Sequence, residues 1–292
     1  MGENKGISVG FKASLGFYEM EVEKVCEILS RIGYKSIEWD MPHFDPRKTT
    51  AAQRKKCKEV PIQFGMEASD IMVQDDYITL SEDERSDRIK HTIECIQAAA
   101  EAGVHIINVF TGPRKWEEGN PRLHTDLPEG RAWEMVLDAY ERIVPVAEKH
   151  QVILALEVCW GMVCRDFYTG NFLLDHFNSD YLCINMDPSH HHLVRNDIPW
   201  VIKQWGPKIK HVHLKDAIGK EGYQDETFTY PVPGGGSIDW KAVFEALDDI
   251  GYDGYCTVEY EAFTYYERVL KEDPVKAAET AYQQVMALVP QS

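Results

Sequence analysis

The sequence is poor in basic residues for its size. Across 292 residues, 31 lysines and arginines stand against 48 aspartates and glutamates, which gives a formal net charge of -17. Nucleic acids and anionic membrane surfaces repel such a chain, so neither is expected as a partner. A small-molecule partner is compatible with this charge.

Long apolar runs and paired cysteines are also missing. No stretch approaches the roughly 18 consecutive apolar residues of a membrane helix, and the N-terminal MGENKGISVG lacks the apolar core of a signal peptide. The seven cysteines form no CxxC pair, and several lie inside apolar runs. This favours reduced, buried thiols over a disulfide framework. We therefore expect a cytoplasmic protein that does not enter the membrane.

Short apolar, β-branched runs alternate with amphipathic stretches along the chain. Eight runs are predicted as strands: residues 7–12, 36–40, 62–69, 104–110, 152–158, 181–187, 209–215 and 255–261. Helical patterns cover residues 19–33, 82–102 and 129–150, and a less regular one covers residues 45–58. Nearly continuous apolar strands joined by helices indicate a parallel sheet that is covered on both faces.

This alternation predicts the α/β class and a single (β/α)8 TIM barrel, with residues 1–292 forming one domain. A doubly wound open sheet is the alternative, but no GxGxxG follows the first predicted strand. No linker-like tract divides the chain.

The last four predicted strands each deliver a side chain that can bind a metal ion: Glu157, Asp187, His213 and Glu259. In a barrel such residues share the C-terminal mouth, so we predict that they bind one divalent cation. Three carboxylates and one imidazole suit Mn²⁺, Mg²⁺ or Co²⁺, and Zn²⁺ is a further candidate. A single strand-end carboxylate is more often a helix cap or a solvated residue. Four ligand-type residues in order, each in an apolar strand, are harder to explain in that way, because burying an unpaired charge costs free energy.

Histidines and a lysine beside these residues are predicted to contact a substrate. His190 could bind a hydroxyl or relay a proton, whereas His191 and His192 are expected to be packing or surface residues. His211 shares a strand face with His213, and could instead orient a ligand from behind. Lys215 could serve a substrate oxygen or pair with the adjacent Asp216.

Four further candidates lie elsewhere in the sequence. Trp116 and His124 belong to the long segment GPRKWEEGNPRLHTDLPEG, which is either a cap over the substrate or a mobile surface loop. As a cap it would offer Trp116 for stacking and His124 as an extra base. Glu38, near the end of the second predicted strand, is a further substrate-binding candidate, and Glu261 is a second choice as a metal ligand.

Five motifs, in the order ALEV, MDPSHH, HVHLKDA, VPGGGSIDW and GYDGYCTVEYE, resemble the xylose isomerase-like TIM barrel superfamily of sugar isomerases and epimerases. The resemblance is strong in the second half of the chain and rests on the strand and helix pattern in the first. It implies one divalent metal, commonly manganese, on Glu157, Asp187, His213 and Glu259. It also implies that the two glutamates act as the acid/base pair and that His190 touches the substrate.

Two branches of the superfamily fit less well. Its epimerases often carry an arginine shortly after the position of His213, but LKDAIGKEGYQDE has none. Its three-zinc endonucleases would need further histidines before Glu157, and GMEASDIM and INVFTGP offer none.

The leading functional hypothesis is a metal-dependent isomerase or epimerase of a sugar or sugar phosphate. Either Glu157 or Glu259 would remove a proton next to a metal-bound carbonyl, through an enediolate, and the other would return it. The alternative is a lyase on a keto-sugar or keto-cyclitol, as in inosose dehydration or 3-oxo-glycoside cleavage. The third is a non-catalytic, metal-containing subunit of a complex. The aromatic segment AFTYYERVLKEDP could pack as a helix or contact another subunit, so a homo-oligomer is also considered.

Overall fold

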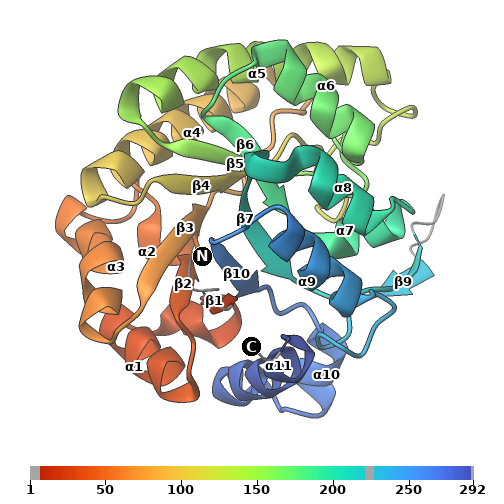
Figure 1. Cartoon of the computed structure of the whole chain (residues 1–292). Helices are drawn as coiled ribbons and strands as arrows, with labels where there is room; N and C mark the ends of the chain where they lie inside the picture. The colour runs from red at the N-terminus through yellow and green to blue at the C-terminus, as the bar shows by residue number, and fades with distance from the viewer. Residues whose placement is uncertain (1–6, 221–226, 291–292) are drawn as a thin grey trace.

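A computed structural model describes residues 7–220 and 227–290. The first six residues and part of the loop after His213, both used in the sequence analysis, lie outside the described residues. Eight parallel strands close into a barrel in the order β1-β10-β7-β6-β5-β4-β3-β2, with the helices around them (Figure 1). The strands are β1 (Ser8–Lys12), β2 (Ser36–Trp39), β3 (Glu67–Met72), β4 (Ile106–Val109), β5 (Ile153–Glu157), β6 (Leu182–Met186), β7 (Ile209–Leu214) and β10 (Tyr255–Val258). The predicted (β/α)8 TIM barrel is confirmed.

The helices follow the strands along the chain. They are α1 (Val22–Ile32), α2 (Met41–Phe44), α3 (Ala51–Gln63), α4 (Glu82–Ala102), α5 (Glu129–His150), α6 (Phe167–Phe177), α7 (Pro188–Leu193), α8 (Ile198–Trp205), α9 (Trp240–Asp249), α10 (Phe263–Arg268) and α11 (Pro274–Leu288). Short 3-10 turns are η1 (Leu15–Glu19) and η2 (Gly206–Lys208), and β8 (Ile218–Lys220) pairs with β9 (Thr227–Thr229) as an antiparallel hairpin. The bounds of α4 and α5 match the predicted ones. For α4 both ends are marked in the sequence, by Ser81 accepting from the Glu84 N–H and by Gly103 in a left-handed conformation.

The third strand is displaced from its predicted position. The predicted strand over residues 62–69 starts at Glu67 instead, because α3 continues to Gln63. Thr50 and Gln53 form a capping box that starts this helix. Ile62, the first residue of the predicted strand, lies in the last turn of this helix and is 52% exposed.

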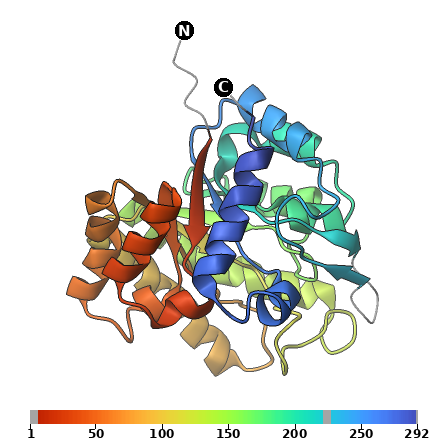
Figure 2. The ribbon, with the colours of Figure 1, turned by 90° about the horizontal axis from the view of Figure 1, so that it is seen from below.

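All eight barrel strands point toward one end of the molecule. Figure 2 shows this from the side, with β1 running down the page and the loop after β4, the β8–β9 hairpin and α10 gathered at the lower end. The carboxyl ends of the strands therefore share one mouth, where barrel enzymes carry their chemistry.

Two expectations about the environment of the chain can be compared with the structure. All seven cysteines are buried and unpaired, as expected from their apolar surroundings. Within residues 7–220 and 227–290, no helix combines the length and apolar character required to cross a bilayer.

Candidate metal centre and active site

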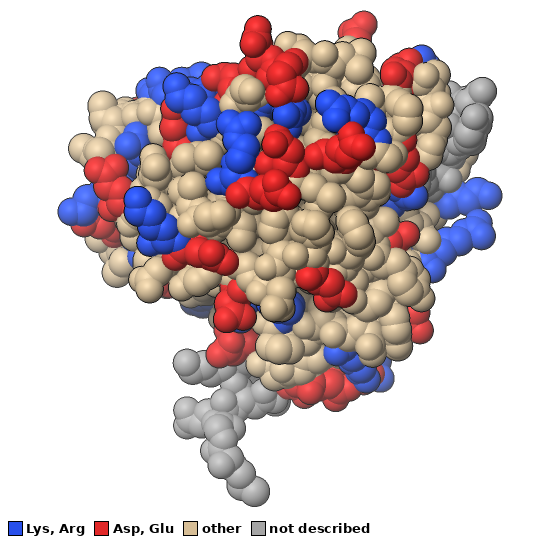
Figure 3. All heavy atoms as spheres, turned by 90° about the horizontal axis from the view of Figure 1, so that it is seen from above, with Lys and Arg blue, Asp and Glu red and all other residues tan. Residues whose placement is uncertain are grey.

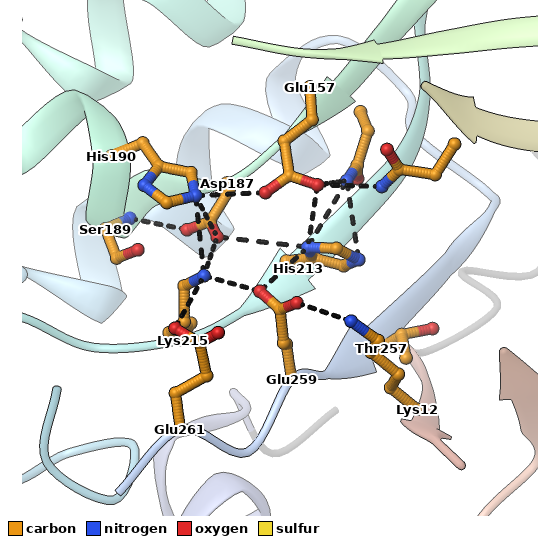
Figure 4. Close-up of polar contacts among 12 residues, drawn as sticks. Lys12, Glu157, Asp187, Ser189, His190, His213, Lys215, Thr257, Glu259 and Glu261 are labelled. Atoms are coloured by element: carbon orange, nitrogen blue, oxygen red, sulfur yellow. Dashed lines mark hydrogen bonds and ion pairs between the residues drawn. The ribbon is translucent and has the colours of Figure 1, made fainter. Parts of the chain in front are cut away.

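The four predicted metal ligands come together at the C-terminal mouth (Figure 4). Glu157 ends β5, Asp187 follows β6, His213 lies in β7 and Glu259 follows β10. One donor atom of each lies within 4.8 Å of the donor atoms of the other three. None of the four is more than 6% exposed. The four strand ends thus bring these side chains together into a compact, buried set of four metal-binding residues, called the donor set below.

Asp187 combines a structural role with a free donor atom. Its Oδ1 accepts a 2.7 Å hydrogen bond from the Ser189 N–H and caps α7. Its Oδ2 is buried and accepts no hydrogen bond from any residue that the structure describes, although Lys215 Nζ lies 3.0 Å away as an ion-pair partner. A buried carboxylate oxygen that accepts no hydrogen bond keeps lone pairs with which it can bind a metal ion.

His213 presents its two ring nitrogens to different carboxylates. Nδ1 lies 3.4 Å from Glu259 Oε2, 3.6 Å from Glu157 Oε2 and 3.8 Å from Asp187 Oδ2. Nε2 lies 3.0 Å from Glu38 Oε2 on its other side. Burial alone would lower the pKa of His213, but Glu38, Glu259 and Glu157 outweigh it and raise that pKa well above its usual value. Glu38 is therefore placed to orient the imidazole from behind.

Two lysines sit beside the donor set, and sequence reasoning missed one of them. Lys12, the last residue of β1, has its Nζ 2.9 Å from Glu259 Oε1 and 3.7 Å from Asp40 Oδ2. Lys215 Nζ lies 2.5 Å from the other oxygen of Glu259 and 3.3 Å from Glu261 Oε2. Lys12 could have been found, because it is a charged residue that ends a predicted buried strand.

The suggested Lys215–Asp216 pair was wrong. Adjacent residues at a strand end point to opposite sides, so Lys215 faces the mouth while Asp216 faces the outside of the barrel. There the Asp216 carboxylate accepts from the Trp240 Nε1–H and from the backbone N–H groups of Gly234 and Gly236. Asp216 thereby holds the glycine-rich loop before α9.

Glu157 and Glu259 are both held as carboxylates. Burial would raise the pKa of Glu259, but Lys12, Lys215 and His213 lower it well below its usual value. For Glu157 burial is opposed by His213 and His190, and its pKa is again lowered well below the usual value. For Asp187, Lys215 and His190 overcome burial and bring the pKa to about 2. Three ionised carboxylates and a ring nitrogen facing one another are a donor set that fits a divalent cation.

A second set of polar groups lies one step deeper in the barrel. His211 Nδ1 lies 3.1 Å from Asn185 Oδ1, and its Nε2 lies 2.9 Å from Thr257 Oγ1 and 3.1 Å from Asp70 Oδ1. The predicted substrate contact of His211 is disfavoured, because both ring nitrogens are engaged and the residue is 1% exposed. The same holds for Glu38, which is 0% exposed and turned toward His213.

Two asparagines that sequence reasoning missed support Glu157. Asn108 Nδ2 donates to Glu157 Oε2 over 2.8 Å, and Asn185 Nδ2 donates to the same oxygen over 3.1 Å. Asn185 could have been found from its spacing, since it precedes Asp187 by two residues and so shares its strand face.

The three histidines of DPSHHH have separate environments. His190 Nε2 lies 3.0 Å from Glu157 Oε1 and 3.4 Å from both Asp187 Oδ2 and Lys215 Nζ. His191 is buried away from this cluster, with Nδ1 against Asn196 Oδ1 and its ring 5.2 Å from that of Trp205. His192 is partly exposed. Only His190 of the three faces the donor set.

The loop after β4 places its two candidates differently. Trp116 is 51% exposed and its ring lies 6.0 Å from that of Trp160. Trp160 Nε1 donates to the Tyr230 hydroxyl, whose ring lies under Lys215 Nζ. The rings of Tyr230, Trp160 and Trp116 thus form an aromatic wall that leads outward from Lys215. The side chain of His124 is 67% exposed and faces Glu129, near the start of α5, a position that disfavours its predicted role as an extra base.

Comparison with known proteins agrees with the barrel fold. The family model described as "Xylose isomerase-like TIM barrel" matches residues 26–288. The chain belongs to this family. An inosose dehydratase of Clostridium perfringens (strain 13 / Type A) is 28% identical over 142 residues, which cover 44% of this chain and 47% of the relative. The chain thus matches about half the length of that curated relative.

Solved structures share the fold over nearly the whole chain. The 3-keto-D-glucoside 4-epimerase YcjR of E. coli superimposes with a TM-score of 0.75 at 17% identity, covering 96% of this chain and 99% of the epimerase. The IOLI protein, whose structure contains a zinc atom, superimposes with a TM-score of 0.74 at 18% identity, covering 97% of this chain and 98% of that protein. At these identities the likeness concerns the fold.

Proposed function

We propose that this protein is a divalent-metal-dependent isomerase or epimerase of a keto-sugar, with Mn²⁺ as its ion. The observation that carries the proposal is the buried donor set of Glu157, Asp187, His213 and Glu259, whose donor atoms lie within 4.8 Å of one another. A divalent ion bound there would polarise a substrate carbonyl and so acidify the neighbouring C–H.

Glu157 and Glu259 are the proposed acid/base pair. They come from β5 and β10, which lie on different sides of the barrel, so they can reach a sugar carbon from different directions. Whichever carboxylate takes the proton, the other can return it to the opposite face or to the adjacent carbon.

The cationic and imidazole groups have distinct proposed roles. Lys215 can offset negative charge that develops on the sugar oxygens, since its ammonium group already faces Asp187 and Glu259. His190 can donate a hydrogen bond to a sugar hydroxyl from Nε2, next to Glu157. Lys12 holds Glu259 in place from the β1 side.

Deuterium wash-in from D₂O tests the proposal. Mn²⁺-loaded protein would be offered ketoses, ketose phosphates, inososes and 3-oxo-glucosides, and exchange of the C–H beside the carbonyl followed by NMR. We expect exchange with at least one of these sugars and accumulation of an isomer. Bound metal without any exchange across the panel would favour the non-catalytic alternative.

A lyase is the second candidate, because the similarity to inosose dehydratases is detected from sequence. Proton removal would be the same, and Lys215 or His190 would protonate the leaving hydroxyl. An unsaturated product with ultraviolet absorbance would identify this reaction, whereas an isomerase forms none.

A further inference from the structure

A groove opens beside the candidate active site. It has a volume of about 450 Å³ and lies between α10 and the segment formed by β9 and the residues after it. Its lining includes Phe228, Tyr230, Glu261, Phe263, Tyr265 and Arg268. This size falls within the range of small-molecule sites, and the mixture of aromatic walls with a few polar groups is typical of them.

The groove is continuous with the donor set. Glu261 and Tyr230 line its inner end, and both also contact Lys215, whose Nζ lies 3.3 Å from Glu261 Oε2 and 4.9 Å from the centre of the Tyr230 ring. That same Nζ reaches Glu259. The Glu261 side chain is 29% exposed while that of Glu259 is 6% exposed. Lys215 therefore lies between the groove and Glu259, one of the two proposed acid/base residues.

The outer wall is apolar and uncovered. No residue of α10 is buried, and Phe263, Tyr265 and Val269 are 50%, 39% and 57% exposed. Aromatic side chains gathered around a hollow, rather than scattered singly, mark a binding surface. They share the groove with Glu261, which contacts Lys215, so this surface lies next to the donor set.

The charges at the groove limit the chemistry of that ligand. Glu261 stands at the inner end, and Arg268 contributes a guanidinium to the lining. A phosphate would require several cationic or N–H donors, and Arg268 is the one cationic residue among the described residues of the lining. An uncharged ring with apolar faces and hydroxyl edges fits these walls better.

We propose that this groove is a subsite for an uncharged second ring attached to the reacting sugar. The substrate is then a glycoside, or another two-ring compound, rather than a free or phosphorylated monosaccharide. This inference rests on the proposed function for the chemistry at the metal centre, but the binding of the second ring is testable by itself.

The test uses the Mn²⁺-loaded full chain and two measurements. Deuterium exchange would be compared for 3-oxo-D-glucose and phenyl 3-oxo-β-D-glucopyranoside. Binding of the unreactive phenyl and methyl β-D-glucopyranosides would be measured by calorimetry. The test variant is the double change Phe263→Ser and Tyr265→Ser, and the matched control is Tyr168→Ser, which alters an aromatic side chain that is 71% exposed on α6.

We expect the unmodified protein and the control to prefer the phenyl glucosides by roughly tenfold, the size expected for burying an aromatic ring. The double variant should lose this preference and keep its activity on 3-oxo-D-glucose. Equal binding of phenyl and methyl glucosides by the unmodified protein would overturn the subsite. A preference that survives in the double variant would also overturn it.

The two proposals fail in different ways. If neither oxo-sugar exchanges while the phenyl preference in binding is present and lost in the double variant, the subsite stands and the proposed reaction fails for these sugars. If both oxo-sugars exchange equally, the reaction stands and the subsite is overturned. Light scattering would measure the oligomeric state of the double variant. If that state changes while glucoside binding does not, the groove is a subunit contact and the subsite is overturned.

Discussion

Asp187 uses its two oxygens for different purposes. One caps α7 and the other points, without a hydrogen bond, toward His213. Asp187 can therefore cap a helix, which is the usual role of an aspartate at a strand end, and also bind a metal ion. The cap fixes the carboxylate so that its second oxygen needs little reorganisation to bind an ion.

The roles of Glu157 and Glu259 can be separated from metal binding. Glu→Gln at either position keeps an oxygen donor but removes the base. We expect each variant to retain part of its Mn²⁺ in elemental analysis, while deuterium exchange falls by roughly a hundred- to ten-thousand-fold. Glu141→Gln, on the exposed side of α5, is the control. Near-normal exchange in both variants would show that another group carries the proton.

His190 should matter for turnover and not for the metal. Its Nε2 reaches Glu157 and Lys215, so His190→Ala removes a group facing the substrate while the four donors stay. We expect turnover to fall by roughly a hundredfold with full metal content, and His192→Ala to change turnover little. Loss of metal in His190→Ala would contradict this division of roles.

At the scale of elements, α7 carries His191, whose protonation is coupled to the stability of the fold. Burial lowers the pKa of His191 from 6.5 to about 4, so the unfolded chain binds the extra proton first as the pH falls. Stability is complete above pH 6.5 and is lost toward pH 4, by roughly 3 kcal/mol from this residue.

This pH dependence can be measured directly. The free energy of unfolding in urea would be compared at pH 7, 6, 5 and 4.5 for the unmodified protein, His191→Gln and the control His192→Gln. We expect only His191→Gln to show a smaller loss on acidification. Parallel curves for all three proteins would rule out His191 as the source.

The glycine-rich loop before α9 depends on one carboxylate. Asp216 accepts hydrogen bonds from Gly234, Gly236 and Trp240, and a Cβ at Gly236 would lie 1.9 Å from Asp216 Oδ1. We expect Asp216→Ala to leave these donors unpaired and to lower the free energy of unfolding by about 2–5 kcal/mol. Asp248→Ala, at an exposed position of α9, should change it by less than about 0.5 kcal/mol. Equal effects of the two changes in urea titrations would refute the role of Asp216.

The sequence predicted most of the barrel and the four donors, for a physical reason. A charged residue at the end of a long apolar run is visible in one strand at a time, and parallel strands bring all such ends to one face. Asp70 and Asn108 were not found, because their importance depends on neighbours from other strands. Lys12 ends a predicted strand and carried the same signal as the four donors, but it was overlooked. The start of β3 was misplaced because Ile62 is apolar yet exposed in the last turn of α3.

At the scale of the molecule, acidic and basic side chains are intermixed on the face over α5 and α6 (Figure 3). The expectation that nucleic acid is not a partner rests on the net charge of -17 and stays a prediction.

Removal of the proposed metal should weaken the whole fold. Binding to the folded state alone stabilises it by about 2.7 kcal/mol at a free metal concentration of one hundred times Kd. For a chain of 292 residues this corresponds to a rise in Tm of roughly 4–5 °C. We expect Mn²⁺ added to chelator-treated protein to raise the Tm measured by calorimetry by this amount. The same addition should not raise the Tm of His213→Ala. An equal rise in both proteins would indicate binding elsewhere.

The pairing of β1 with β10 closes the barrel, and it has a consequence for synthesis. Lys12 and Glu259, which meet across that closure, are 247 residues apart in the chain. Ribosomes add roughly 5–20 residues per second, so the second of these residues emerges on the order of tens of seconds after the first. During that interval β1 has an open edge, a surface on which nascent chains can associate wrongly. The donor set is also incomplete until Glu259 leaves the exit tunnel, so a metal ion that arrives earlier meets only part of its site.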